Sequence, residues 1–137
     1  MSEAGATFAP GVVRVSGTVR AGHAVLEDSR GRRWVVEVPR TRRERMRGLR
    51  GRDELAPGRA LLLLRTRSVQ TAGMRFPISA VLLDAHGTVL HVLHVGPGRV
   101  TRPRRRVRHV LECPAGTDLR PGDRLSLEPV GPRRAGP

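Results

Sequence analysis

The chain has 137 residues, enough for one compact domain but too few for two independent hydrophobic cores. It carries 26 residues of the lysine and arginine class against 12 acidic residues, and all 26 are arginine, which gives a formal net charge of +14. A codon-composition bias explains why arginine replaces lysine, but it does not explain twice as many cations as anions. The excess charge therefore indicates an anionic partner or a role in solubility.

The scarcity of cysteine and of aromatic residues excludes several classes of site. Cys113 is the single cysteine, so neither an internal disulfide nor a cysteine-rich metal site is available. Phe8, Trp34 and Phe76 are the only aromatic residues, too few for a nucleic-acid reader that stacks single-stranded bases on several exposed rings. We expect no cofactor and no bound metal.

Two features of the sequence bear on the cellular location of the protein: the N-terminal segment and the longest apolar run. Residues 1–10 are small and polar and predict a flexible leader, since they lack the basic and apolar regions of a signal peptide. The longest apolar run, Ala60 to Leu64, is far shorter than the roughly 20 residues of a membrane-spanning helix. We therefore expect a cytoplasmic protein without a membrane span.

The first elements predicted after the leader are strands. Valines alternate with polar residues over 13–19, which is typical of a half-buried strand. Residues 24–27 and 32–38 flank Asp28-Ser29-Arg30-Gly31, whose Asp and Gly suit the first and fourth positions of a type I turn. This pattern predicts a hairpin with Trp34, Val36 and Val38 on one face.

One helix is predicted next. Thr41-Arg42-Arg43-Glu44 has the form of a capping box, in which the threonine hydroxyl and the glutamate carboxylate each bind the other residue's amide. Met46 and Leu49 supply a narrow apolar stripe, and Gly48 and Gly51 offer places to end. We expect two to three turns that are stable only when docked on a sheet.

The rest of the chain again predicts strands. Residues 60–64 suit a strand covered on both faces, and 78–83 and 88–95 form a second hairpin around Asp84-Ala85-His86-Gly87. Shorter strands are predicted over 107–112 and 125–127, and a disordered tail over 129–137. The fold class is thus mainly β with one short helix: a single domain over 11–128, either a β-sandwich or a partly closed barrel.

Half of the arginines occupy two segments. Seven surround the predicted helix together with acidic residues, namely Arg40, Arg42, Arg43, Arg45, Arg47, Arg50 and Arg52. Six follow the second hairpin with no acid until Glu112, namely Arg99, Arg102, Arg104, Arg105, Arg106 and Arg108. Guanidinium groups bind phosphate bidentately, so these six are candidate anion-binding residues, with RNA, DNA or another polyanion as the partner. The alternative is a solvated loop in a chain biased towards arginine.

Catalytic and metal-binding patterns are not recognisable. His91 and His94 are three residues apart on a predicted strand and point to opposite faces, which disfavours a shared metal. The carboxylates are scattered, and no nucleophile elbow or phosphate-binding loop is present. Cys113 is interpreted as a small buried hydrophobe, with a reactive thiol as the alternative. No catalytic residue is assigned.

Three ordered segments resemble a known family. They are Glu44 to Arg52, Thr71 to Ile78 running into Leu82-Leu83-Asp84, and Val110 to Gly116. Together they resemble the bacterial and archaeal domain of unknown function 192 family, over about residues 24–128. The resemblance implies a compact β-rich domain with a short helix and without an established activity or cofactor.

The resemblance also indicates a shared site. Its candidate residues are the matching polar and sulfur-bearing positions Arg45, Thr71, Met74, Asp84 and Glu112. Turn and packing roles are the alternative explanation for all five. The chain departs from the family pattern at Ala72, where a bulky aromatic is usual, and at Ser79, where an aspartate is common.

Three functions are consistent with the sequence. The first is a non-enzymatic binding or accessory domain whose basic surface meets an anionic partner. The second is a structural subunit of an envelope or secretion assembly with protein partners. The third is a hydrolase or small-molecule pocket that uses Glu112, Asp84 or a histidine.

Overall fold

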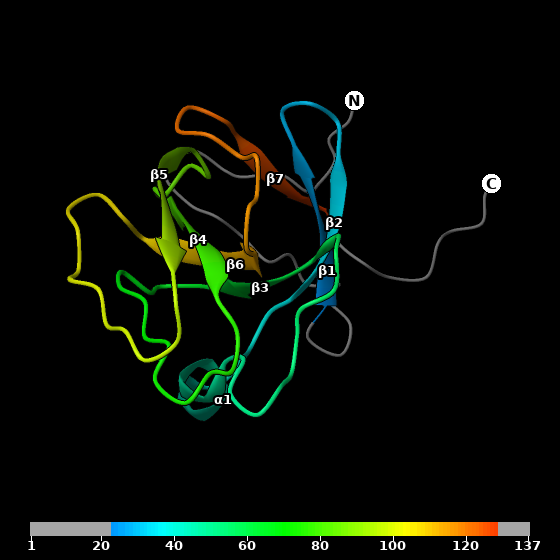
Figure 1. The fold of residues 1–137 in the computed structure, drawn as a ribbon. Coiled ribbons are helices and arrows are strands. Elements are labelled where there is room, and N and C mark those ends of the chain that lie inside the picture. The colour runs from blue at the N-terminus through cyan, green and yellow to red at the C-terminus, as the bar shows by residue number, and fades with distance from the viewer. Residues whose placement is uncertain (1–22, 129–137) are drawn as a thin grey trace.

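The computed structural model describes residues 23–128, which form a curled sheet of seven strands and one short helix (Figure 1). The elements are β1 His23–Asp28, β2 Arg33–Glu37, α1 Arg42–Arg47, β3 Arg59–Leu63, β4 Ile78–Leu83, β5 Val89–Val95, β6 His109–Pro114 and β7 Leu125–Glu128. The predicted leader, the predicted strand over 13–19 and the predicted tail lie outside the described residues. The mainly β fold class is confirmed.

Both predicted hairpins are present. β1 pairs with β2 and β4 pairs with β5, and in each turn the glycine amide donates to the aspartate carbonyl, from Gly31 to Asp28 and from Gly87 to Asp84. Each aspartate also holds its turn with its side chain. The Asp84 carboxylate accepts from the amides of His86 and Thr88 at 2.8 and 2.9 Å. Local turn chemistry therefore determines these two hairpins.

The helix begins where predicted but is shorter than predicted. Thr41 accepts from the amide of Glu44 at 3.0 Å, and the Glu44 carboxylate accepts from the amide of Thr41, so the capping box is formed. The helix ends after six residues at Gly48, whose φ is +50°. The predicted apolar stripe is wrong at Met46, which is 63% exposed, whereas Leu49 beyond the helix is buried. Docking thus depends on Leu49 and not on a helical face.

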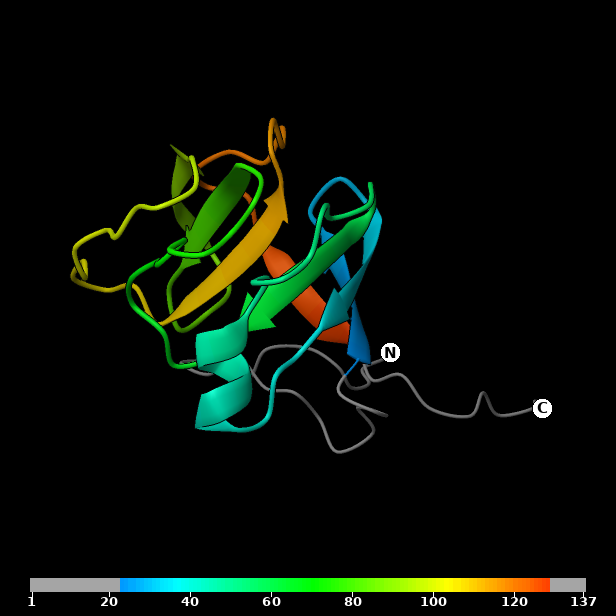
Figure 2. The same cartoon turned by 60° about the horizontal axis from the view of Figure 1, so that its bottom comes forward.

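The sheet order is β5-β4-β6-β3-β2-β1-β7. All pairs are antiparallel except β2 with β3, because α1 lies in the crossover between these two strands (Figure 2). β3 is buried on both faces as predicted, since strands flank it on both sides and side chains cover both of its surfaces. β6 continues the buried centre of the sheet between β3 and β4.

The two edges of the sheet approach each other. Thr88, just before β5, forms an isolated bridge with Arg124, just before β7, and the Val89 amide donates to the Asp123 carbonyl at 2.8 Å. The architecture is therefore the partly closed barrel, one of the two predicted alternatives. Curling in this way hides part of the edges that an open sheet exposes.

Two apolar clusters lie on opposite faces of the sheet. The first fills the inside of the curl and receives side chains from all seven strands, among them Leu26, Leu62 and Leu111. The second lies outside β3, β4, β5 and β6 and is covered by Leu49, Val69, Met74 and other side chains from the connecting loops. The second cluster brings α1 and these loops onto the sheet.

No helix among residues 23–128 is both long and apolar enough to cross a membrane.

Candidate functional site

The arginine loop, residues 96–108 between β5 and β6, is held by a buried threonine. Thr71 is completely buried; its hydroxyl donates to the Gly96 carbonyl at 2.6 Å and accepts from the Arg99 amide at 2.9 Å. Its own amide donates to the Arg99 carbonyl at 2.7 Å. Thr71, a candidate pocket residue from the family resemblance, therefore positions the arginine loop.

A second loop lies between the arginine loop and α1 in both views of the fold (Figures 1 and 2). This linking loop comprises residues 64–77. The Thr66 amide donates to the Arg108 carbonyl at 2.9 Å, and the Arg67 guanidinium donates to the Arg104 carbonyl at 3.3 Å. Arg67 and three residues of the arginine loop line an open hollow of about 350 Å³; the three are Arg105, Arg106 and Arg108.

The linking loop also meets the arginines around α1. Arg65 lines the same pocket as Arg45, and the Arg50 side chain packs over Gly73, whose φ is +82°. The arginines near α1 and those of the arginine loop are therefore joined through the linking loop. We call the joined set the basic belt: Arg42, Arg43, Arg45, Arg47, Arg50, Arg65, Arg67, Arg105, Arg106 and Arg108.

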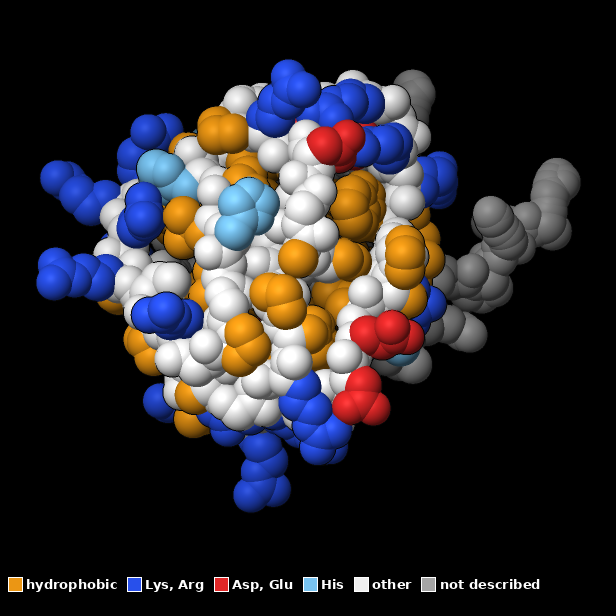
Figure 3. All heavy atoms as spheres, viewed as in Figure 1, with side chains coloured by type: hydrophobic (Ala, Val, Ile, Leu, Met, Phe, Trp, Pro, Cys, Tyr) orange, Lys and Arg blue, Asp and Glu red, His pale blue; other side chains and the backbone are white. Residues whose placement is uncertain are grey.

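The basic belt lacks acidic partners among the described residues. Ion pairs are formed instead by arginines outside the belt, among them Arg30, Arg32, Arg52 and Arg75. All members of the belt are exposed except Arg45, which is half-buried. In Figure 3, arginine side chains project from the side that carries the arginine loop and from the end that carries α1. Arg99, Arg102 and Arg104 are also exposed on the arginine loop.

Beneath part of the belt, a pocket of about 290 Å³ opens over the second apolar cluster. We call it the Glu112 pocket. It brings together Arg45 of α1, Met74 of the linking loop and Glu112 of β6, three of the five candidates that the family resemblance indicated. Sequence spacing alone could not predict this convergence, since the three residues come from separate elements.

Glu112 is the unusual residue of this pocket. It lies opposite Leu61 of β3 and Ala80 of β4, and only 3% of its surface is exposed. None of the hydrogen bonds or ion pairs among residues 23–128 involves its carboxylate. Burial raises the pKa of Glu112 to about 7, so both protonation states are populated at neutral pH.

Asp84 is not part of the Glu112 pocket. It lies in the turn after β4, four residues beyond Ala80, the β4 partner of Glu112. At about 3.3 Å per strand residue, the two positions are roughly 13 Å apart along the sheet. Asp84 and Thr71 thus both have local structural contacts. The carboxylates of Asp84 and Glu112 are too far apart to form an acid–base pair.

The two departures from the family pattern lie on different segments. Ser79 of β4 is completely buried, and its hydroxyl accepts from the amides of Gly116 and Thr117 at 3.0 and 3.2 Å and lies 3.3 Å from His94 Nδ1. It thereby ties the loop after β6 to the sheet. Ala72 is half-buried in the linking loop beside Thr71, and nothing in the structure explains this departure.

The histidines and the cysteine do not assemble into a metal site within the described part of the chain. No group there contains three or more histidine, cysteine or acidic side chains placed to hold a metal ion. Cys113 is fully buried, and burial raises the pKa of its thiol to about 12, assisted by the Glu112 charge. Such a thiol is unreactive, which agrees with its interpretation as a small hydrophobe.

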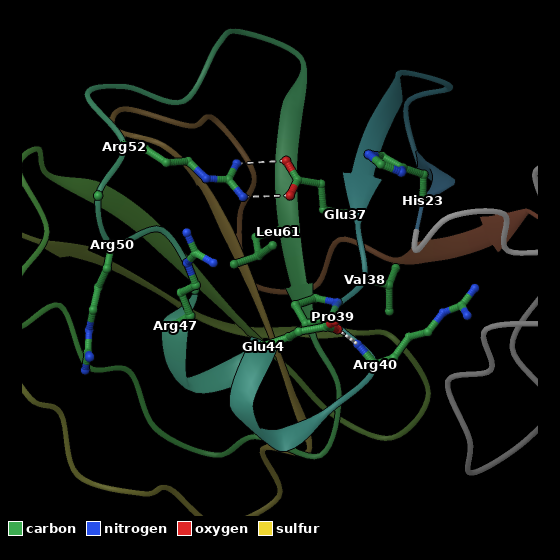
Figure 4. Close-up of a pocket in the computed structure, with 12 residues that line it drawn as sticks. His23, Glu37, Val38, Pro39, Arg40, Glu44, Arg47, Arg50, Arg52 and Leu61 are labelled. Atoms are coloured by element: carbon green, nitrogen blue, oxygen red, sulfur yellow. Dashed lines mark hydrogen bonds and ion pairs between the residues drawn. The ribbon is translucent and has the colours of Figure 1, made fainter.

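A larger pocket lies on the other side of α1, and sequence analysis did not predict it. This hollow of about 580 Å³, the Glu37 pocket, has the Glu37 carboxylate facing the Arg52 guanidinium with two hydrogen bonds of 2.7 and 2.8 Å (Figure 4). The Arg52 contact lowers the pKa of Glu37 despite its partial burial. The Glu37 carboxylate thus has a charge partner, which the Glu112 carboxylate lacks among the described residues.

One family model matches the part of the chain that forms the sheet and the helix. The model of DUF192, described as "Uncharacterized ACR", matches residues 24–127, most of the chain. The chain belongs to the DUF192 family. The resemblance seen in the sequence is thereby confirmed. No curated protein matches this DUF192 protein.

Two solved structures are similar to this DUF192 protein. One, described as a "putative transcription regulator" from Sinorhizobium meliloti 1021, is 27% identical with a TM-score of 0.66, and the match covers 77% of this chain and 92% of that one. The other, a protein of unknown function from Novosphingobium aromaticivorans DSM 12444, is 20% identical with a TM-score of 0.65, covering 83% and 90%. The second likeness shows the fold alone.

Proposed function

We propose that this DUF192 protein is a non-enzymatic binding domain whose basic belt contacts the phosphate backbone of a nucleic acid. The observation that carries the proposal is the hollow lined by Arg67, Arg105, Arg106 and Arg108, without a carboxylate, and its connection to the arginines of α1. Like charges gathered around one hollow repel each other, and a bound polyanion removes that repulsion. Guanidinium groups also match phosphate geometry bidentately.

Backbone conformation supports the proposal. Two non-glycine residues between positions 23 and 128, Arg65 and Arg106, have positive φ angles, +53° and +70°, and both belong to the basic belt. Glycine or asparagine adopts this conformation more easily, and other residues lose roughly 1–2 kcal/mol there. Backbone strain at two arginines of the same surface favours a role for their side chains in binding.

The proposal predicts binding without base readout. Only Phe76 and Trp34 are aromatic among the described residues, and both are half-buried, so stacking on exposed rings does not contribute. The name of the Sinorhizobium relative, a "putative transcription regulator", is consistent with nucleic acid as the polyanion. Affinity should therefore depend on salt and hardly on sequence.

Fluorescence anisotropy with a labelled DNA duplex tests this proposal. Between about 50 and 200 mM salt, the logarithm of the affinity should fall by about 0.9 per neutralised phosphate for each unit of log salt. The triple change Arg104→Ser, Arg105→Ser and Arg106→Asn should weaken binding and lower that slope by about 2 to 3. Asparagine is chosen at position 106 because it tolerates positive φ.

A matched control removes the same charge away from both the basic belt and the arginine loop. The control positions are exposed and do not line the hollows of the belt; they are Arg59, Arg120 and Arg124. Changing all three to serine should preserve most of the salt dependence of the affinity. Equal losses in both triple variants would show that net charge alone is responsible. Undetectable binding of the native protein at low salt would reject the proposal.

The protein-assembly alternative gains no comparable support from the described surface. Its large exposed hydrophobic side chains are Val35, Met46 and Val100, which lie on β2, α1 and the arginine loop. Single apolar residues on separate elements are ordinary for a protein surface.

A further inference from the structure

The Glu112 pocket contains a buried charge for which folding offers no partner. Glu112 exposes 3% of its residue surface, and its carboxylate, which lines the pocket, accepts no hydrogen bond from the described residues. Removing such a group from bulk water opposes folding. Its neighbours Leu61 and Ala80 show that an apolar residue would suit this position of β6. A buried polar group without a partner therefore indicates a ligand that supplies the missing donors.

The walls of the pocket define the shape of such a ligand. Leu49, Leu63 and Met74 form apolar parts of the lining, and Thr66 and Ser68 add hydroxyl groups on the side of the linking loop. A volume of about 290 Å³ lies at the lower end of small-molecule pockets, which run from roughly 300 to 1,000 Å³. A pocket of this size admits a sugar phosphate, or the base and part of the sugar of a nucleotide.

The charges around the pocket define the two ends of the ligand. Arg45, Arg47 and Arg65 of the basic belt line the pocket, so the local field attracts anions and repels cations. An amine or a metal cation is therefore disfavoured as the partner of Glu112. Neutral N–H or O–H donors satisfy a carboxylate without meeting that repulsion.

We propose that the Glu112 pocket binds a small phosphomonoester whose ring carries neutral hydrogen-bond donors that Glu112 accepts, while the arginines of the pocket bind the phosphate. Two kinds of compound have this chemistry: a nucleoside monophosphate whose base offers N–H donors, and a sugar phosphate that offers hydroxyls. This site is independent of backbone binding by the arginine loop, because Arg104, Arg105 and Arg106 do not line it.

Isothermal titration of the full chain at neutral pH distinguishes the two sources. The probes are guanosine 5′-monophosphate, adenosine 5′-monophosphate, ribose 5-phosphate and inorganic phosphate. Guanine offers adjacent N1–H and N2–H donors that a carboxylate can accept together, whereas adenine offers one amino group. Tighter binding of guanosine than of adenosine and ribose phosphates identifies a base ligand, and equal binding of the three organic phosphates identifies the sugar hydroxyls. In either case we expect the preferred probe to bind at least about tenfold more tightly than inorganic phosphate.

Variants connect that affinity to Glu112. Glu112→Gln preserves the shape but exchanges an acceptor for a donor, and should weaken the preferred probe by about tenfold to a hundredfold. Asp53→Asn, which removes an exposed carboxylate paired with Arg75, is the control and should have no effect. Ser68→Phe fills the pocket while keeping Glu112, so it tests the site even if the glutamine variant does not fold.

The proposal is overturned if every probe binds no better than inorganic phosphate, or if neither pocket variant changes the affinity of a probe that does bind. The triple variant of the arginine loop should retain probe binding while its duplex binding weakens, and Glu112→Gln should do the reverse. Failure of the pocket and failure of the belt are thereby separate results.

Discussion

Ser79 shows how a single hydroxyl can join two segments of the sheet. Its buried oxygen accepts from two consecutive amides, those of Gly116 and Thr117, in the loop that follows β6. A serine is sufficient to hold this loop, since the two amides need an acceptor and not a charge.

We expect Ser79→Ala to lower the free energy of unfolding by about 1–3 kcal/mol, because two amides lose their acceptor. Urea denaturation measures the change. Ser126→Ala, at a half-buried serine of β7, is the control and should stay within about 0.5 kcal/mol of the native protein. An equally small effect at Ser79 would mean that water replaces the hydroxyl.

Single residues also mark the limit of prediction from sequence. Arg65 and Arg67 connect the two arginine clusters, yet this pair lies outside both dense arginine runs of the sequence. The dense runs on either side were found because local density is visible in a sequence. Contact between runs is decided by tertiary packing, which no spacing rule reports.

At the scale of elements, features set by turns and helix caps could be predicted from the sequence, whereas the pairing of distant strands could not. The Asp-to-Gly turns fixed two hairpins, and the capping box fixed the start of α1. The parallel pairing of β2 with β3 was not predicted, because it depends on the whole crossover and not on a turn. Met46 was misjudged for a related reason, since the helix ends before its apolar face is completed.

The arginine loop depends on Thr71 for its position, which can be tested by proteolysis. Thr71→Val keeps the shape but removes the hydroxyl bonds to Gly96 and Arg99. Local opening of the loop should become easier, and trypsin should cleave after Arg104 to Arg106 about tenfold faster. Thr88→Val, at a half-buried threonine in another turn, is the control and should leave the cleavage rate unchanged.

At the scale of the whole molecule, two buried groups act on stability in opposite directions. Burial, with the nearby charges of Arg108 and Arg65, lowers the pKa of His109 from 6.5 to about 4. The unfolded chain therefore binds the extra proton between these values, and stability rises with pH. Burial raises the pKa of Glu112 from 4.5 to about 7, so the folded chain keeps the extra proton and stability falls with pH.

We expect these two slopes, each about 1.4 kcal/mol per pH unit, to cancel in the native protein between about pH 5 and 6.5. In Glu112→Gln only the effect of His109 remains, so the free energy of unfolding should rise by about 2 kcal/mol from pH 5 to pH 6.5. His109→Asn should uncover the Glu112 slope, with a fall of similar size, and the double variant should be flat. Urea unfolding at both pH values measures all four proteins, and identical profiles would contradict the assignment.

β1 and β7 are the first and last strands described, and they lie side by side in the sheet. During synthesis on the ribosome, the β1–β2 hairpin emerges early, but β1 lacks its second neighbour until β7 has left the exit tunnel. The basic belt and the Glu112 pocket are built from residues 42–112, so their whole sequence emerges before that last strand does. A nascent chain can thus expose all the arginines of the basic belt while the barrel is still open.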